Sequence, residues 1–374
     1  MPADAFCSSS AGIEAARRLG EATPQPSGRR GRGATANPSG RYEAARRESF
    51  DDGWSAEEEA VALRTEVRPE HARTLITRNT SPDISFDRSI NPYRGCEHGC
   101  VYCFARPNHA YVGLSPGLDF ETKLFRKVNA GALLEAELSA PGYRPATIAL
   151  GTATDPYQPI EREHRVTRAV LEVLARFRHP VGIVTKSNLV VRDLDLLTDL
   201  ARDGLVKVAI SVTTLDPVLA RRLEPRAPHP QKRLDAIGRL SAAGIPVMVI
   251  AAPIIPSLND HEIEAILGQA RALGAQEASH VLLRLPLELD DLVNDWFAEH
   301  YPGRQRHVMS LVRAARGGKA YDAAFGTRMT GTGAYADLIR QRMRLARLRL
   351  GYPEVRRRLR TGLFRVPTDQ LSLF

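Results

Sequence analysis

The stretch Asn91-Pro-Tyr-Arg-Gly-Cys-Glu-His-Gly-Cys-Val-Tyr-Cys-Phe-Ala-Arg-Pro107 decides which fold we expect for this chain. It holds three cysteines, Cys96, Cys100 and Cys103, with three residues between the first pair and two between the second. A four-iron cluster takes one ligand on each iron, and thiolates are its usual protein ligands. Three thiolates leave one iron without a protein ligand. The spacing therefore predicts a [4Fe-4S] cluster with one iron open to a small molecule.

Zinc and disulfides are the alternative uses of these cysteines. A zinc site would need a fourth ligand such as His98, and the sequence has no second Cys or His knuckle. The only other cysteine, Cys7, lies far away in a polar segment, and a long, Cys-poor chain is not typical of a disulfide scaffold. We see no signal peptide and no apolar stretch long enough to span a bilayer, so we expect a cytoplasmic protein with no membrane partner.

The cysteine spacing resembles that of the radical S-adenosylmethionine (SAM) superfamily, whose loop reads Cys-x3-Cys-x2-Cys with an aromatic residue before the third cysteine. Tyr102 holds that place here. The resemblance implies a [4Fe-4S] cluster whose open iron binds the amino and carboxylate groups of SAM. It also implies an electron donor such as flavodoxin or ferredoxin, and cleavage of SAM to a 5′-deoxyadenosyl radical.

Short apolar runs alternate with amphipathic segments between residues 84 and 287, which favours a parallel sheet covered by helices. This pattern alone fits a doubly wound sheet, an eight-unit barrel or a smaller barrel. The resemblance implies an α/β fold with a partial (β/α)6 TIM-type barrel. We expect strands at 84–86, 147–151, 181–185, 206–211, 247–251 and 281–285, and helices at 166–176, 194–202, 233–243 and 263–273.

The chain divides into four expected regions. Residues 1–65 form a flexible N-terminal region, which to Glu48 is rich in Ser, Gly, Pro, Ala and Arg and is predicted to be disordered. Residues 66–302 form the barrel, residues 303–366 a basic helical region, and residues 367–374 a short tail. The net charge is +9, and residues 304–365 hold 16 Lys and Arg against 3 Asp and Glu. This excess favours a polyanionic partner, with compositional bias as the alternative.

Polar residues follow the expected strands, where a parallel barrel places its chemistry. The resemblance implies that they bind SAM, since its members bind the amino group after the second strand and the ribose after the fourth. For the second strand, a proline-ended turn with an Asx cap is the alternative. We expect a Lys leaving a buried strand to meet an anion, here the SAM carboxylate. The candidates are Tyr102, Thr152, Thr154, Asp155, Lys186, Ser211 and Arg226, with Arg233 as a second arginine.

A longer series of motifs resembles the spore photoproduct lyase group, the DNA repair photolyases of this superfamily. It includes Gly151-Thr-Ala-Thr-Asp-Pro156, Val184-Thr-Lys-Ser187 and Glu224-Pro-Arg226, and the likeness covers roughly residues 68–352. The resemblance implies action on damaged DNA. The lyase, however, returns a hydrogen atom from an extra Cys near the second-strand motif, and this chain has none there. Tyr157 is the catalytic residue we expect in its place.

The chain ends in Asp369-Gln-Leu-Ser-Leu-Phe374, which resembles the short peptide that docks bacterial repair proteins on the β sliding clamp. Its apolar side chains would fill a surface pocket and its amide would orient the peptide. The alternative is that this tail packs on its own domain. The predicted clamp contacts are Gln370, Leu371, Ser372, Leu373 and Phe374.

Three functions remain open. The first is a radical SAM enzyme of the photoproduct lyase type acting on damaged DNA, and the second is a radical SAM enzyme that modifies RNA. The third is an iron-sulfur protein that binds DNA or the clamp without turnover. The clamp-like tail favours the first over the second, and cleavage of SAM would exclude the third.

Overall fold

The structure is a computed structural model that describes residues 31–43, 63–355 and 357–367 of the chain. Its centre is a seven-stranded sheet in the order β10-β9-β8-β7-β6-β3-β2. All neighbouring strands from β3 to β10 are parallel, and only β2 is antiparallel. The six parallel strands form the expected partial (β/α)6 barrel. The bounds are β2 Thr77–Arg78, β3 Arg88–Ile90, β6 Ile148–Leu150, β7 Val181–Thr185, β8 Val206–Val212, β9 Val247–Ile254 and β10 Glu277–Leu282.

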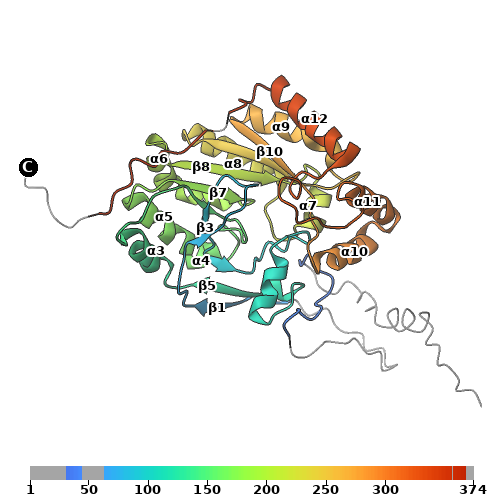
Figure 1. The fold of residues 1–374 in the computed structure, drawn as a ribbon, viewed down its shortest axis with the longest axis horizontal. Coiled ribbons are helices and arrows are strands. Elements are labelled where there is room, and N and C mark those ends of the chain that lie inside the picture. The colour runs from blue at the N-terminus through green and yellow to red at the C-terminus, as the bar shows by residue number, and fades with distance from the viewer. Residues whose placement is uncertain (1–30, 44–62, 356, 368–374) are drawn as a thin grey trace, which may run out of the picture.

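Helices cover the outer side of this curved sheet (Figure 1). The longer helices α3, α5, α6, α8 and α9 each bury a stripe of aliphatic side chains, as an amphipathic helix in a βα unit does. The helical segments of this part of the chain are α3 Ala130–Ser139, α4 Glu161–His164, α5 Val166–Arg176, η2 Asn188–Asp193, α6 Leu194–Arg202, α7 Pro217–Leu223, α8 Pro230–Ala242, η3 Asp260–Glu262 and α9 Ile263–Ala272.

A small second sheet carries the cysteine segment. Its order is β1-β5-β4, with β1 (Glu66–Glu70) parallel to β5 (Lys123–Lys127) and β4 (Tyr93–Arg94) antiparallel to it. The cysteines follow β4, and η1 (Arg106–Val112) and α2 (Asp119–Thr122) lead back into β5. The sheet therefore anchors both ends of the cysteine segment.

The C-terminal helices complete the molecule. Helices α10 (Leu289–His300) and α11 (Pro302–Ala314) pack together, and α12 (Gly333–Arg349) packs on α9 and β10. One hydrophobic cluster joins Val101 and Tyr102 of the cysteine segment to Trp296 and Phe297 of α10. The C-terminal region therefore supports the cysteine segment, and the predicted boundary at residues 302/303 stays a prediction.

Most of the predicted barrel elements are confirmed. β7, α5 and α6 have the predicted bounds, and β6, β8, β9, α8 and α9 differ by a few residues at their ends. Continuous runs of Val and Ile predicted these strands, because both faces of a central parallel strand are buried.

Two strand predictions were wrong in position. Residues 84–86 lie in a loop that the Asn79 side chain holds by donating to the Phe86 carbonyl, and the first barrel strand is β3. The last strand, β10, begins at Glu277, not at Val281, because the Glu277 carboxylate is buried against Lys207. A polar residue that is paired can open a buried strand, which an apolar pattern alone does not reveal.

The ends of the chain also differ from expectation. Residues 31–43 were predicted to be disordered, yet they pack on the cysteine segment with Gly33, Ala34 and Gly40 buried. The basic C-terminal region is helical in α11 and α12, but residues 357–367 contain no helix or strand. They run beside the barrel, where the Arg360 and Arg365 amides donate to the Gly204 and Phe177 carbonyls. No helix within the described ranges is long and apolar enough to cross a membrane.

Candidate active site

The three cysteines sit in a tight backbone segment after β3 and β4. The Cys96 amide donates to the Phe120 carbonyl, and the Val101 amide donates to the Leu223 carbonyl at the end of α7. The thiols are free, with Cys96 and Cys100 buried and Cys103 partly exposed. Gly99 between them has φ +68° and its position would place a Cβ 2.6 Å from a Glu121 oxygen. A side chain is excluded there, so the turn needs glycine.

A buried ion pair fixes the back of this segment. Arg106 contacts Glu121 at 2.6 Å, and both side chains are fully buried. The same guanidinium donates to the carbonyls of Cys100, Pro116 and Gly117. Because burial of an unpaired charge is costly, each partner keeps the other in place and the cysteine backbone with them.

The N-terminal strap, which we define as residues 31–43, closes over the same carboxylate. The amides of Gly33 and Ala34 donate to the two Glu121 oxygens at 2.9 and 2.8 Å. A Cβ on Gly33 would lie 1.7 Å from the Gly99 carbonyl oxygen. The strap therefore lies directly on the cysteine segment.

The thiols share one electrostatic environment. Burial raises the pKa of all three, and the charges of Asp155 and Glu224 raise the pKa of Cys96 and Cys100 further. Cys103 packs against the hydrophobic cluster that contains Cys96 and against the one that contains Cys100, so the three cysteines lie close together. Thiols in such a place release their protons to solvent when they bind a cation, because the cation supplies the missing positive charge.

Lys186 and Glu224 form the polar centre beside the thiols. The Lys186 ammonium donates to the Ser211 hydroxyl at 2.9 Å, lies 3.3 Å from the Glu224 carboxylate and faces the Tyr102 ring. The buried Glu224 carboxylate also accepts from the Tyr102 and Thr213 hydroxyls and pairs with Arg233. Burial lowers the pKa of the Lys186 ammonium. Three predicted residues, Tyr102, Lys186 and Ser211, are thus brought together here.

The residues after β6 tie the neighbouring loops together. Asp155 accepts from the Tyr157 amide, the Thr185 hydroxyl and the Lys186 amide, and lies 3.4 Å from His98. Burial works against its charge, yet these partners hold the pKa of the Asp155 carboxyl below its usual range. The contact to the Tyr157 amide is the Asx turn that the sequence left open. Asp155 thus lies at the thiols but already has protein partners.

The two threonines of this motif face the start of the cysteine segment. Thr154 donates to the Tyr93 carbonyl at 3.0 Å, and the Thr152 hydroxyl lies 3.3 Å from the Asn91 amide nitrogen. Asn91 also accepts from the Ala153 and Thr154 amides. Thr152 remains partly exposed, whereas Thr154 is buried.

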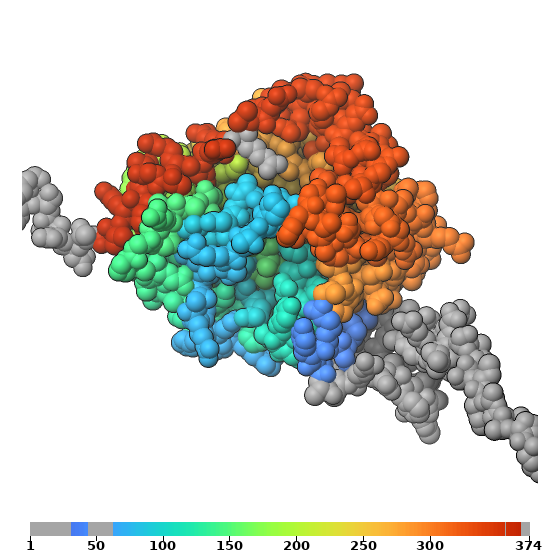
Figure 2. Space-filling model, in the orientation of Figure 1, coloured from blue at the N-terminus to red at the C-terminus, as the bar shows by residue number. Residues whose placement is uncertain are grey.

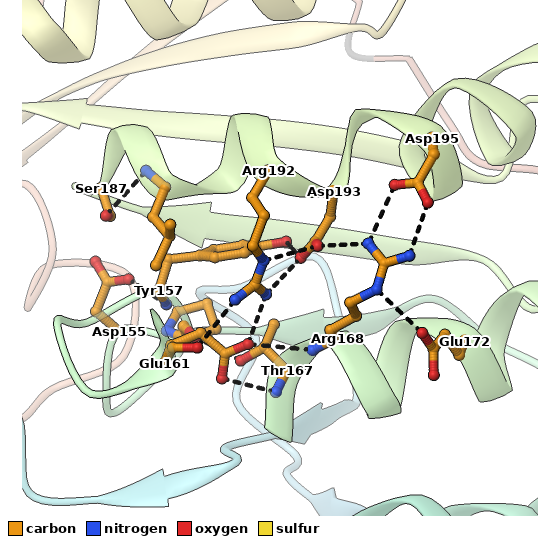
Figure 3. A network of polar contacts seen from close by, with 12 residues as sticks. Asp155, Tyr157, Glu161, Thr167, Arg168, Glu172, Ser187, Arg192, Asp193 and Asp195 are labelled. Carbon is orange, nitrogen blue, oxygen red and sulfur yellow. Dashed lines mark hydrogen bonds and ion pairs between the residues drawn. The ribbon is translucent and has the colours of Figure 1, made fainter. Parts of the chain in front are cut away.

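Tyr157 and Arg226 lie apart from the polar centre. The fully buried Tyr157 hydroxyl donates to Asp193 at 3.1 Å, in a network with Arg192, Arg168 and Glu161 (Figure 3). Burial raises its pKa well above the usual range. The exposed Arg226 pairs with Glu97 at 2.8 Å, and that buried carboxylate also accepts from Thr65. Their predicted roles stay predictions.

Two residues of the site, Glu224 and Gln158, are not among the candidates predicted from the sequence. Glu224 enters the sequence analysis only as part of a Glu-Pro-Arg motif, and its partners follow β7 and β8 or lie on α8 and in the cysteine segment. Gln158 was missed, although its side chain accepts from the Glu97 amide and donates to the Gly95 carbonyl. No local signal marks such contacts, because the partners are far apart in the sequence.

The donor set fits a four-iron cluster. Three buried or half-buried thiols face one another, and no group of three His, Cys, Asp or Glu in the described part of the chain is close enough to hold a single metal ion. Thiolates of a cluster bind different irons and need not converge on one point. The ammonium, hydroxyls and carboxylates at the ends of β7 and β8 are groups suited to the charged ends of SAM.

Comparison with known proteins decides the family. The sequence profile of the radical SAM superfamily matches residues 90–270. An uncharacterised Mycobacterium tuberculosis protein is 39% identical over 232 residues, which are 62% of this chain and 68% of the relative. The chain belongs to the radical SAM superfamily. This membership implies a [4Fe-4S] cluster and SAM as its cofactors.

Other matches extend the picture of this radical SAM protein. An uncharacterised Methanocaldococcus jannaschii protein is 29% identical over 187 residues, or 49% of this chain and 65% of the relative. A variant of spore photoproduct lyase superposes with a TM-score of 0.57 at 16% identity, covering 76% of this chain and 79% of the lyase. Another, with bound AdoMet and a dinucleoside spore photoproduct, gives 0.56 at 15%. At these identities the lyases show a shared fold.

Proposed function

We propose that this protein is a radical SAM enzyme that cleaves SAM reductively and acts on damaged DNA. The observation that carries the proposal is the placement of Cys96, Cys100 and Cys103 at the carboxyl ends of six parallel strands, next to a polar centre. The shared fold with spore photoproduct lyase and the net charge of +9 support a nucleic acid substrate.

Cys96, Cys100 and Cys103 would hold the cluster, which would supply the electron for reductive cleavage of SAM to methionine and a 5′-deoxyadenosyl radical. The chain supplies binding and orientation. We assign the three thiolates to three irons, and Lys186 to the SAM carboxylate. We assign the ribose to Ser211 and the amino group to the backbone and side chains of residues 152–155. Tyr102 and Glu224 orient the Lys186 ammonium.

The return of a hydrogen atom to the product needs a separate donor. Among the described residues the cysteines are the three of the cluster segment. Tyr157 remains our proposed donor, and to serve it must break its hydrogen bond to Asp193. Tyr157→Phe tests this: a donor role predicts that 5′-deoxyadenosine still forms while repaired product is lost. Normal product yield would leave Tyr157 with a packing role.

The proposal also includes a docking partner, an electron donor and a cellular location. Residues 370–374, the clamp-like peptide, lie outside the described residues, so β-clamp binding rests on the sequence alone. Residues 357–367 run beside the barrel before it. We also propose a flavodoxin or ferredoxin as electron donor and a cytoplasmic location, because a reducing compartment keeps the thiols free. Deletion of residues 368–374 should abolish clamp binding and leave SAM cleavage intact.

The deciding experiment is turnover of anaerobically reconstituted protein with labelled SAM and a strong reductant. A panel of UV-damaged DNA, undamaged DNA and RNA is added in turn. The proposal predicts 5′-deoxyadenosine formation that damaged DNA stimulates, with loss of the lesion. Stimulation by RNA alone would make it an RNA-modifying enzyme. A loaded cluster with no SAM cleavage would make it a binding protein without turnover.

A further inference from the structure

The segment between α11 and α12, residues 315–332, links the two ends of the open sheet. It lies beside β10, where the Leu282 amide donates to the Met329 carbonyl at 3.0 Å. It reaches the loop before β3, where Asp83 accepts from the Gly326 amide and pairs with Arg328, both at 2.5 Å. Figure 2 shows a hollow between this orange segment and the light-blue residues before β3. The segment therefore forms one wall of this hollow, which we call the entrance to the site.

Three arginines gather at this wall, and two of them have partners. Arg328 pairs with Asp83 and donates to the Ser81 hydroxyl. Arg316 is buried and donates to main-chain carbonyls, including that of Leu283 at 2.9 Å. The third, Arg284, follows β10 and is half-buried. Within the described residues it has no hydrogen bond and no ion pair.

The guanidinium of Arg284 lies beside the cysteines. It stacks on the ring of Phe104 with 4.5 Å to the ring centroid, and Phe104 is the residue after Cys103. The positive charge of Arg284 acts on Cys103, and burial lowers the pKa of the guanidinium itself. An arginine has five donors and stays charged, so a half-buried one without a partner is costly. An anion at this place would remove the cost.

The ring below Arg284 points to the kind of anion. Phe104 is 45% exposed although it adjoins a buried loop, and Phe325 on the facing wall is 60% exposed beneath Arg328. An exposed aromatic ring with a neighbouring guanidinium is how proteins hold unstacked nucleotides, because the ring takes the base and the arginine takes the phosphate. An inorganic anion has no aromatic surface that could stack on the Phe104 ring.

We propose that Arg284 and Phe104 form a nucleotide subsite, in which Arg284 binds a backbone phosphate and Phe104 stacks on a base. The inference rests on the proposed function, since it names the contact that holds the nucleic acid at the radical site. The subsite adjoins the cysteine segment, so the nucleotide reaches it from a single strand or after leaving the duplex stack.

Affinity of the reconstituted protein for a short single-stranded DNA carrying one thymine photoproduct tests the contact. Arg284→Gln should weaken binding about 10- to 100-fold, because a charge-assisted hydrogen bond to phosphate is lost. The slope of log K against log salt should fall by about 0.7, the value for one phosphate on a single strand. Arg239→Gln removes the same charge from an exposed position on α8, outside the basic C-terminal region, and should change affinity little.

A methylphosphonate scan makes the test specific. One uncharged linkage replaces each phosphodiester in turn, and one position should weaken wild-type binding yet have no further effect on Arg284→Gln. Arg284→Lys should restore part of the affinity, because it keeps the charge without the two-pronged contact. Phe104→Leu should weaken binding with an unchanged salt slope.

Four outcomes would overturn the inference. Equal affinities of Arg284→Gln and Arg239→Gln would show that Arg284 does not touch DNA. A loss of SAM affinity alone would make the SAM carboxylate its partner, and a shift of the cluster's potential alone would make it a charge partner of the cluster. If the wild-type protein cleaves SAM but binds no DNA, the proposed substrate class is wrong. The inference about Arg284 and Phe104 is then wrong as well, because it rests on that substrate class.

Discussion

At the scale of single residues, the site depends on one buried carboxylate that serves several partners. Glu224 is fully buried and joins Lys186, Arg233, Tyr102 and Thr213. Its two cations come from β7 and α8, and Tyr102 comes from the cysteine segment. One side chain therefore couples the thiols to two barrel units.

Glu224→Gln removes the negative charge and keeps the shape. Two cations, the buried Arg233 and the half-buried Lys186, then lack a counter-charge, so we expect the free energy of unfolding to fall by roughly 3 kcal/mol. Urea denaturation measures it. Glu264→Gln, which breaks the more exposed pair with Arg342, should cost less than about 1 kcal/mol. Equal losses of unfolding free energy in the two variants would show that the buried Glu224 contributes no more to stability than the more exposed Glu264.

His179 gives a pH-dependent prediction away from the cysteines. Its Nδ1–H donates to the Pro180 carbonyl at 3.0 Å, and its Nε2 accepts from the Tyr143 hydroxyl at 2.8 Å. Burial lowers the pKa of His179 to about 4, with Arg88 as the nearby charge that acts in the same direction. In the unfolded chain a histidine titrates near 6.5, so the unfolded state takes up the proton first as pH falls. Its stabilisation is complete above about pH 6.5 and is lost as pH falls toward about 4.

The variant His179→Gln should remove this dependence. Between pH 7 and pH 5 the unfolding free energy of the wild type should drop by about 2 kcal/mol more than that of the variant. Urea titrations at both pH values measure the difference. Replacing the exposed His71 with Gln serves as the control and should leave the drop unchanged. Parallel drops in wild type and His179→Gln would contradict the assignment.

At the scale of elements, the N-terminal strap is the part whose packing the sequence patterns did not predict. Its Gly- and Arg-rich composition is typical of a disordered segment, and its partner Glu121 lies 88 residues from Gly33 in the chain. The barrel units were visible because their apolar runs are local and continuous. Contacts between distant polar residues leave no such pattern, so the sequence did not predict the pairing of Arg226 with Glu97.

Gly33→Ala tests whether the strap holds the cysteine segment. The added Cβ would collide with the Gly99 carbonyl, so the strap must move and the two amide contacts to Glu121 must weaken. We expect iron to leave the reconstituted protein several-fold faster in the presence of a chelator, followed by visible absorbance. Gly303→Ala on α11 meets no atom within 4 Å and should release iron at the wild-type rate. Matching rates in the two variants would rule out a holding role for the strap.

At the scale of the whole molecule, an open parallel sheet gathers loops from every strand at one edge. Cys96, Lys186, Ser211, Glu224 and Arg284 follow or end five different elements, and the fold brings them together. The spacing of the cysteines predicted the family and the strand order predicted the edge. Arg284 was inside an expected strand, so only the true end of β10 at Leu282 placed it at the entrance.

The central claim is that three thiolates hold a cluster that cleaves SAM. Iron content and 5′-deoxyadenosine formation, measured together on anaerobically reconstituted protein, test it most directly. The wild type and Cys7→Ala should bind about four irons per chain and form 5′-deoxyadenosine with a strong reductant. Cys96→Ala, Cys100→Ala and Cys103→Ala should each lose the cluster and the product. One tightly held zinc with no iron uptake, or an intact cluster in any of the three variants, would contradict the account.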